Sequence, residues 1–257
     1  GILGSKLIGW KNFEFFFRSD AAFFTTFNTL FYNLIFIVFG TLLNISVALL
    51  LNEVRNRKAI KFYQTVMFFP HFLSWVVVSF ILYGFLSNAY GILNQIMPMI
   101  GLHPQNWYQY PTAWRFILVG AYLWKGMGMG VLITYAVLIG IDRSYYEAAE
   151  IDGANKMQLI LHISLPFLIP ITLIQFILTI GNIFRADFGL FYQLPQGSGT
   201  LEKVTSVIDT YVFRMLMDSN EVGIGSAIGL FQSVVGLVLI VTTNAIVKRI
   251  EADNALF

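Results

Sequence analysis

The sequence predicts an all-α fold, a polytopic bundle of about five transmembrane helices. Of its 257 residues, 57% are hydrophobic and only 12% are charged, about half the charged share of an ordinary soluble domain. Several apolar stretches reach the ~20 residues that a helix needs to cross the hydrocarbon core of a bilayer. This composition excludes a soluble enzyme. The net charge of +2, with scattered Lys and Arg residues, excludes a nucleic-acid-binding surface.

Residues 1–26 precede the first predicted span and differ from it in character. Charged residues interrupt this segment, and the aromatic side chains around Trp10 give it the amphipathic pattern of a membrane-surface stretch. It lacks the basic start, apolar middle and small-residue cleavage site of a signal peptide. We therefore expect an external, interfacial segment.

Five apolar runs then predict the spans. Their ranges are 27–51, 64–86, 112–140, 165–184 and 223–247. Gly126, Gly128 and Gly130 in the third span suggest a nucleotide loop, but the lack of a preceding strand favours close helix packing through small residues. The chain contains no Gly-x-x-x-x-Gly-Lys-Ser/Thr phosphate loop. It has no cysteine and its three histidines are far apart, so no metal site is expected.

The distribution of Lys and Arg predicts the orientation of the spans. The loop after the first span, the loop after the third and the carboxyl-terminal tail together carry eight of these residues. Residues 87–111 carry none, and residues 185–222 carry three. The positive-inside rule therefore places the first group in the cytoplasm and residue 1 outside. A sixth span upstream of residue 1 is one simple way to account for an external start followed by five spans.

Both long external segments contain side chains that suit binding. Aromatic residues cluster at 106–114. We favour a belt of aromatic side chains at the level of the lipid headgroups over contact with an external partner or a sugar ring. The segment 187–200 is punctuated by Gly and Pro, and predicts a long loop between spans. Loops of this length in compact proteins tend to be functional or disordered.

The cytoplasmic loop 141–164 is the most informative segment. Ser144 and Glu147 have the spacing of a capping box, which predicts the start of a short helix. Gly153 is placed to end that helix, because glycine adopts the left-handed conformation at little cost. Residues 154–162 are again compatible with a helix. The loop therefore predicts a helix-turn-helix on the cytoplasmic surface.

This loop carries a resemblance to a known family. Glu147-Ala148-Ala149, then Gly153 after three residues, then Ile163-Ser164-Leu165-Pro166 after nine, resembles the cytoplasmic loop motif of membrane subunits of binding-protein-dependent ABC importers. Residues 9–14 and 69–71 resemble those of the carbohydrate-importing branch, particularly permeases for oligosaccharides and polysaccharides such as the alginate importer. The resemblance covers nearly the whole chain, although carbohydrate members usually have six or more spans.

The resemblance implies a permease subunit with a type I ABC importer-like fold, forming a single transmembrane domain (residues 1–257) in a bacterial inner membrane. Its partners would be a second permease, two cytoplasmic ATPase subunits, an external solute-binding protein and a carbohydrate. ATP and Mg²⁺ would be held by the ATPase subunits, with no cofactor and no catalysis in this chain. The residues that match the ATPase-coupling loop are Glu147, Ala148, Ala149, Asp152 and Gly153.

Two further sets of residues are candidates for sites. The substrate path is expected at polar and aromatic residues near the external half of adjacent spans, namely Tyr122, Trp124, Lys125, Gln175, Asn182 and Phe184. Contact with the binding protein is expected at Phe188, Phe191, Tyr192 and Gln193.

The substrate-path residues also allow structural interpretations. A single Asn or Gln in a span more often makes an interhelical hydrogen bond. Lys125 could meet an acidic sugar, pair with a neighbouring subunit, or bond backbone carbonyls and snorkel. The alternative function is a self-contained channel or secondary transporter for a small polar solute. It predicts intramembrane acidic residues or a repeat of spans, whereas the predicted spans contain no Asp or Glu and show no clear repeat.

Overall fold

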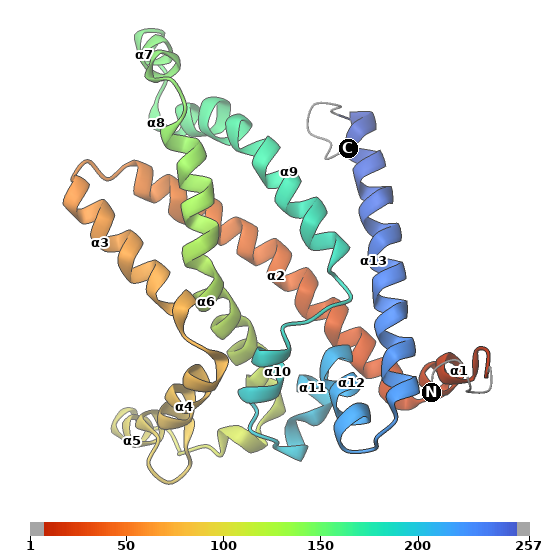
Figure 1. Cartoon of the computed structure of the whole chain (residues 1–257). Coiled ribbons are helices and arrows are strands. Elements are labelled where there is room, and N and C mark those ends of the chain that lie inside the picture. The colour runs from red at the N-terminus through yellow and green to blue at the C-terminus, as the bar shows by residue number, and fades with distance from the viewer. Residues whose placement is uncertain (1–7, 251–257) are drawn as a thin grey trace. The chain divides into compact units, whose positions relative to one another are not determined.

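A computed structural model describes residues 8–250, and every regular element among them is a helix (Figure 1). The described residues form two compact units. Unit 1 contains residues 8–33, 74–118 and 181–239, and unit 2 contains residues 34–73, 119–180 and 240–250. The segments that the charge distribution predicts to be cytoplasmic all belong to unit 2. Those predicted to be external belong to unit 1, as expected if each group shares one side of a membrane.

Four helical stretches are long and apolar enough to cross a membrane, and a bent pair makes a fifth. The four are Asp20–Asn52, Pro111–Ile139, Lys156–Gly181 and Val222–Arg249. They contain α2 (Asp20–Asn52), α6 (Pro111–Ile139), α9 (Leu165–Gly181) and most of α13 (Val222–Ile250). The number of spans agrees with the five predicted from sequence.

The amino-terminal segment is partly helical. Helix α1 (Lys11–Arg18) is separated from α2 by Ser19, whose Oγ accepts a hydrogen bond from the backbone N–H of Ala22 at 3.2 Å. This contact explains why α2 begins at Asp20, earlier than the predicted residue 27. Part of the predicted interfacial segment 1–26 therefore belongs to α2, and residues 1–7 of it lie outside the described range.

The second predicted span is not one straight helix. Helix α3 (Arg57–Phe68) continues into a 3₁₀ turn, Phe69–Phe72, and α4 (Trp75–Leu86) then runs at 101° to it. Pro70 has no N–H to donate, and Ser74 starts α4 by accepting a hydrogen bond from the Val77 N–H at 3.3 Å. The predicted span 64–86 is therefore a bent pair of helices, because these two local signals interrupt the helix within the apolar run.

Unit 2 is held together by apolar packing among α2, α6 and the start of α9. One hydrophobic cluster of this unit contains the buried residues Ala48, Leu51, Val131, Leu138, Ile141 and Leu168. A Cβ added at Gly128 would meet the backbone of Met67, and one at Gly130 would meet the Asn44 amide. Gly128 and Gly130 thus permit the close helix packing that the sequence predicts, whereas a Cβ at Gly126 would meet no atom within 4 Å.

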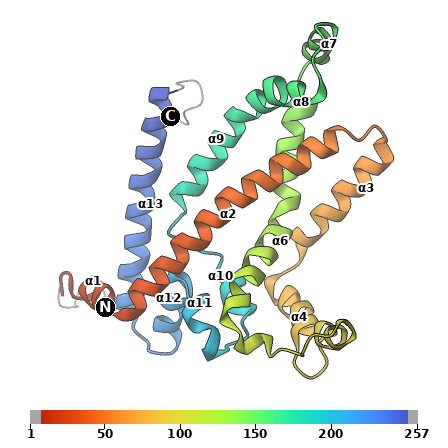
Figure 2. The ribbon, with the colours of Figure 1, turned by 180° about the vertical axis from the view of Figure 1, so that it is seen from behind.

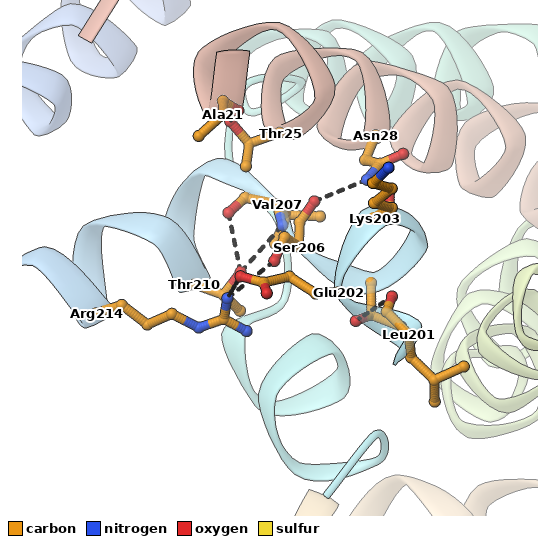
Figure 3. A network of polar contacts seen from close by, with 11 residues as sticks. Ala21, Thr25, Asn28, Leu201, Glu202, Lys203, Ser206, Val207, Thr210 and Arg214 are labelled. Atoms are coloured by element: carbon orange, nitrogen blue, oxygen red, sulfur yellow. Dashed lines mark hydrogen bonds and ion pairs between the residues drawn. The ribbon is translucent and has the colours of Figure 1, made fainter. Parts of the chain in front are cut away.

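Unit 1 is organised around the amino-terminal half of α2. The segment that contains α11 (Glu202–Thr205) and the start of α12 (Ile208–Met217) docks on this helix through side chains. Asn28 Nδ2 donates to the carbonyls of Lys203 and Ser206, each at 2.9 Å (Figure 3). The Ile208 N–H donates to Thr29 Oγ1 at 2.9 Å. Since these groups are buried, the contacts hold the segment in a single arrangement.

The chain between α9 and α10 (Phe188–Gln193) is irregular, and side chains satisfy its backbone. Asn33 Nδ2 donates to the carbonyls of Ile183 and Arg185 at 2.9 and 3.0 Å. Asp209 Oδ2 accepts from the Ala186 N–H at 2.7 Å, and burial raises the pKa of that carboxyl. The fourth span therefore ends at Gly181 rather than at the predicted residue 184.

Candidate functional site: the cytoplasmic loop and the polar pocket of unit 2

The first arm of the cytoplasmic loop is helix α7 (Arg143–Ile151). Asp142 is its N-cap, and its carboxylate accepts a hydrogen bond from the Ser144 N–H at 2.9 Å. Hydrogen bonds from the backbone and side chain of Ser144 hold the pKa of Asp142 below its ordinary value. The predicted capping box at Ser144 and Glu147 was therefore wrong, because the preceding aspartate takes the cap.

The turn after α7 has the geometry predicted for Gly153. Its φ is +85°, the Gly153 N–H donates to Glu150 O at 3.1 Å, and the Ala154 N–H donates to Ala149 O at 2.9 Å. These two bonds are those of a Schellman motif. An added Cβ at Gly153 would meet no atom within 4 Å, so only the backbone conformation requires glycine there.

The second arm has an N-terminal cap that the sequence analysis did not predict. Asn155 caps α8 (Lys156–Leu159) in a capping box with Gln158, with bonds of 3.0 and 2.7 Å. A π-helical turn, Ile160–Ser164, then leads into α9. The Asn-x-x-Gln spacing is the signal by which this cap could have been found. Figure 2 shows α7 beyond the ends of α6 and α9.

One side of the loop is exposed and mixes apolar and acidic groups. Ile151 is 87% exposed, and the side chains of Ala148 and Asp152 are also in solvent. The turn between α7 and α8 borders an open hollow of about 340 Å³. Its lining includes the small residues Ala149, Gly153 and Ala154 together with Asp152, Gln158 and His162. A surface of this kind fits a protein partner whose backbone approaches closely.

The other side of the loop is fixed to the spans. The Tyr146 hydroxyl lies 3.0 Å from Ser164 Oγ, and Ser164 is only 2% exposed. The Tyr145 ring packs against Phe167 with centroids 5.5 Å apart. Sequence reasoning did not assign Tyr146 to a site, since its contact depends on how α7 packs on α9.

A second link ties the loop to the segment between α2 and α3. Lys156 Nζ and Glu53 Oε2 form an ion pair at 2.7 Å. This pair lines a hollow of about 610 Å³ behind α7, together with other charged residues. Those residues are Arg55, Arg57, Arg143, Glu147 and Glu150. The loop thus contacts the chain directly after α2 and directly before α9.

Two of the predicted substrate-path residues share a pocket of about 160 Å³ in unit 2. Tyr122 and Gln175 line it with Asn44 and Thr179, and the Tyr122 ring stacks on Phe36 at a centroid distance of 3.7 Å. The pocket therefore combines an aromatic face with amide and hydroxyl groups. Phe36 has no sequence signal for the path, because its approach to Tyr122 depends on packing between helices.

The other four substrate-path residues are placed differently. Trp124 is 42% exposed and does not line the pocket. Lys125 Nζ donates to His71 O at 3.1 Å, one of the backbone contacts considered for it. Asn182 and Phe184 belong to unit 1, where Phe184 packs against Phe231.

The predicted binding-protein contacts form a helix instead of an irregular loop. Asp187 caps α10 by accepting from the Leu190 N–H at 3.2 Å. Phe191 is only 3% exposed and packs against Tyr32, so it cannot form an exposed tip. Tyr192 remains partly exposed. The Asp-x-x-Leu spacing was the missed signal for this helix.

Comparisons with known proteins agree with this geometry. The family model described as "Binding-protein-dependent transport system inner membrane component" matches residues 40–252. The chain is 31% identical to the polygalacturonan/rhamnogalacturonan transport system permease protein YteP of Bacillus subtilis, covering 99% of this chain and 78% of that protein. It is 34% identical to the arabinooligosaccharides transport system permease protein AraP of the same species, covering 83% and 69%.

Solved structures are similar over almost the entire chain. A crystal structure of a bacterial alginate ABC transporter, in complex with alginate pentasaccharide-bound periplasmic protein, matches with a TM-score of 0.89 at 31% identity. The match covers 95% of this chain and 84% of that one. A second, of a bacterial ABC transporter involved in the import of the acidic polysaccharide alginate, gives 0.91 at 30% identity, covering 97% and 86%.

Proposed function

From the premise that the chain belongs to the family of binding-protein-dependent transport system inner membrane components, we propose that it forms part of the translocation path for an oligosaccharide or polysaccharide. Membership makes the chain a multi-pass inner-membrane permease subunit of an ABC importer and a transport component, not an enzyme. The carbohydrate substrate is supported by the relatives, whose names refer to polygalacturonan, arabinooligosaccharides and alginate.

The cytoplasmic loop is the proposed docking site of the ATPase subunits. The observation that carries this proposal is α7 itself, a capped helix that presents Ile151, Ala148 and Asp152 to solvent while Tyr146 fixes its opposite side to the spans. Glu147, Ala148, Ala149, Asp152 and Gly153 are the proposed contacts. ATP and Mg²⁺ would bind the ATPase subunits, because this sequence has no phosphate loop.

Closure of the ATPase subunits would move the spans through the inner side of the loop. A displacement of α7 reaches α9 through Tyr146 and Ser164, and reaches α2 through the Glu53–Lys156 ion pair. The same two helices contribute Asn44 and Gln175 to the polar pocket. The loop therefore contacts the chain next to the two helices that line a place where a sugar could be held.

The pocket suits transient binding of a sugar. The Tyr122 ring offers an apolar face, and the Asn44 and Gln175 amides offer donors and acceptors for hydroxyl groups. Its volume of about 160 Å³ is small compared with the 300–1,000 Å³, roughly, of sites that enclose whole ligands. Partial enclosure favours passage over retention. A second permease would complete the path, and an external solute-binding protein would deliver the substrate.

Reconstitution tests the proposal. The importer, with its ATPase subunits and binding protein, is placed in proteoliposomes, and uptake of trigalacturonate, arabinotriose and histidine is measured. We expect uptake of at least one sugar that requires both ATP and the binding protein, and none of histidine. Sugar uptake without ATP would favour the self-contained transporter, and uptake of histidine alone would overturn the carbohydrate assignment.

A further inference from the structure

The side of α10 that does not face the core presents aromatic rings. Phe188 and Tyr192 lie one turn apart, with ring centroids 4.9 Å apart and ring planes inclined by 17°. Phe213 of α12 packs against both rings, again at centroid distances of 4.9 Å. We name these three residues the aromatic platform. It combines two elements that are separate in the sequence, which is why Phe213 was not recognised from sequence.

The platform is held rigidly from behind. Leu190, on the opposite side of α10, is fully buried. Asp187 caps the helix and also accepts a hydrogen bond from Trp75 Nε1 at 2.7 Å. The Trp75 ring lies so close to α10 that a Cβ added at Gly189 would collide with it. Helix α10 thus lies between α4 and α12 (Figure 1), and its rings are positioned before any ligand arrives.

The surface of the platform is open enough for a ligand to reach. Tyr192 is 39% exposed, and Phe188 and Phe213 are half-buried. Phe188 and Tyr192 cover one face of each other by stacking, so a pyranose ring would lay its C–H bonds mainly on the exposed part of the Tyr192 ring while its hydroxyl groups stay in water. Rigid aromatic rings lose little conformational entropy on binding, so a small contact area suffices. The charge distribution of the chain places this segment outside the membrane.

We propose that the aromatic platform binds a sugar ring of the substrate on the external side, between its release from the binding protein and its entry into the membrane. The inference rests on the proposed function, since it takes the substrate to be a carbohydrate. It reassigns Phe188 and Tyr192 from contact with the binding protein to contact with the sugar. A headgroup belt would also place aromatic residues here, but it would not require two helices to bring three rings together.

Replacement of Tyr192 by Leu tests the proposal, because this removes a ring from a partly exposed position and keeps an apolar side chain. The complete importer is placed in lipid nanodiscs without binding protein. Binding of trigalacturonate and arabinotriose is measured by saturation-transfer NMR with irradiation of the aromatic protons. We expect Tyr192→Leu to weaken binding of the imported sugar about fivefold, the size of one aromatic contact. Tyr192→Phe keeps the ring and should keep the affinity.

The matched control is Tyr110→Leu, at an external tyrosine that is 49% exposed and lies outside the platform. Equal sugar affinity in Tyr192→Leu and Tyr110→Leu, with normal ATP-dependent uptake by the wild type, would overturn the inference alone. So would a Tyr192→Leu importer that binds sugar normally but binds the binding protein weakly, because the surface would then be a protein contact. Absence of ATP-dependent uptake of either sugar by the wild type would mean that the proposed function had failed.

Discussion

At the scale of single residues, Gly153 has the most specific requirement in the cytoplasmic loop. Its φ of +85° lies in a region that costs other residues roughly 1–2 kcal/mol, with β-branched side chains affected most. Gly153→Val should therefore disrupt the turn after α7. We expect sugar uptake per ATP hydrolysed to fall severalfold, while the amount of assembled importer in the membrane stays near that of the wild type.

Gly153→Asn is the matched variant, because asparagine tolerates the left-handed conformation better than other residues. It should retain most of the coupling. Uptake and hydrolysis are measured together in proteoliposomes. If Gly153→Val couples as well as Gly153→Asn, the left-handed turn is not needed for transmission.

The stability of the folded chain should depend on pH through Asp209, and the surroundings of this carboxyl decide the sign of the dependence. Burial raises its pKa above the ordinary value of 3.8, against the opposing effects of hydrogen bonds from Ala186 and Gln232 and of the Arg185 charge. The folded chain therefore keeps the proton to a higher pH than the unfolded chain. Stability should fall as pH rises from the unfolded to the folded pKa and level off above it.

Asp209→Asn should remove this fall, since an amide keeps an acceptor for the Ala186 N–H without titrating. Thermal unfolding of the purified importer at a series of pH values measures the slope. Asp218→Asn, at the exposed end of the same helix, reports the effect of removing a charge in solvent. An unchanged slope in Asp209→Asn would assign the pH dependence to other groups.

At the scale of elements, the contact between Tyr146 and Ser164 joins α7 to α9. Tyr146→Phe should leave the Ser164 hydroxyl buried without this partner, which costs about 1–3 kcal/mol. We expect lower thermal stability and less uptake per ATP. The double variant Tyr146→Phe/Ser164→Ala lacks both hydroxyl groups and should recover most of the stability, because removal of both partners of a buried hydrogen bond is nearly neutral.

The four combinations form a double-mutant cycle, which isolates the energy of the pair. Tyr145→Phe is the control, since the Tyr145 ring rather than its hydroxyl makes the contact with Phe167. Additive losses in the cycle would show that Tyr146 and Ser164 do not act together. The coupling role would then have to pass to the Glu53–Lys156 pair.

The helices could be predicted from sequence to the extent that each depends on local signals. The apolar runs were long enough to identify all five spans, and Gly153 was recognised because a left-handed turn has a strong residue preference. The bend before α4 and the cap of α10 had local signals at Pro70, Ser74 and Asp187, which the apolar pattern masked. Contacts between distant residues, such as Lys125 with His71, had no such signal.

The candidate sites differ in the same way, by whether a local sequence motif or tertiary packing defines them. Glu147 and Gly153 could be proposed from sequence because the motif lies within one loop. The pocket residue Phe36 and the platform residue Phe213 come from other helices, so only tertiary packing identifies them. Of the six predicted path residues, packing brings Tyr122 and Gln175 together in one pocket.

At the scale of the whole molecule, the proposed function requires a cytoplasmic loop that docks on an ATPase subunit and spans that pass a sugar. The chain contains no cysteine, so a single introduced thiol can report on one position without background. Ile151 is suited to this purpose, because it is 87% exposed on α7 and its replacement leaves the core intact. Ser219, exposed in the segment predicted to be external, gives the matched position.

The most direct measurement is the crosslinking of Ile151→Cys in the importer within intact membranes, with Ser219→Cys as control. The account predicts that Ile151→Cys crosslinks to the ATPase subunit, that ATP changes the yield, and that an impermeant maleimide added to whole cells labels only Ser219→Cys. Labelling of Ile151→Cys from outside, or its failure to crosslink to an ATPase that co-purifies with the chain, would contradict the account.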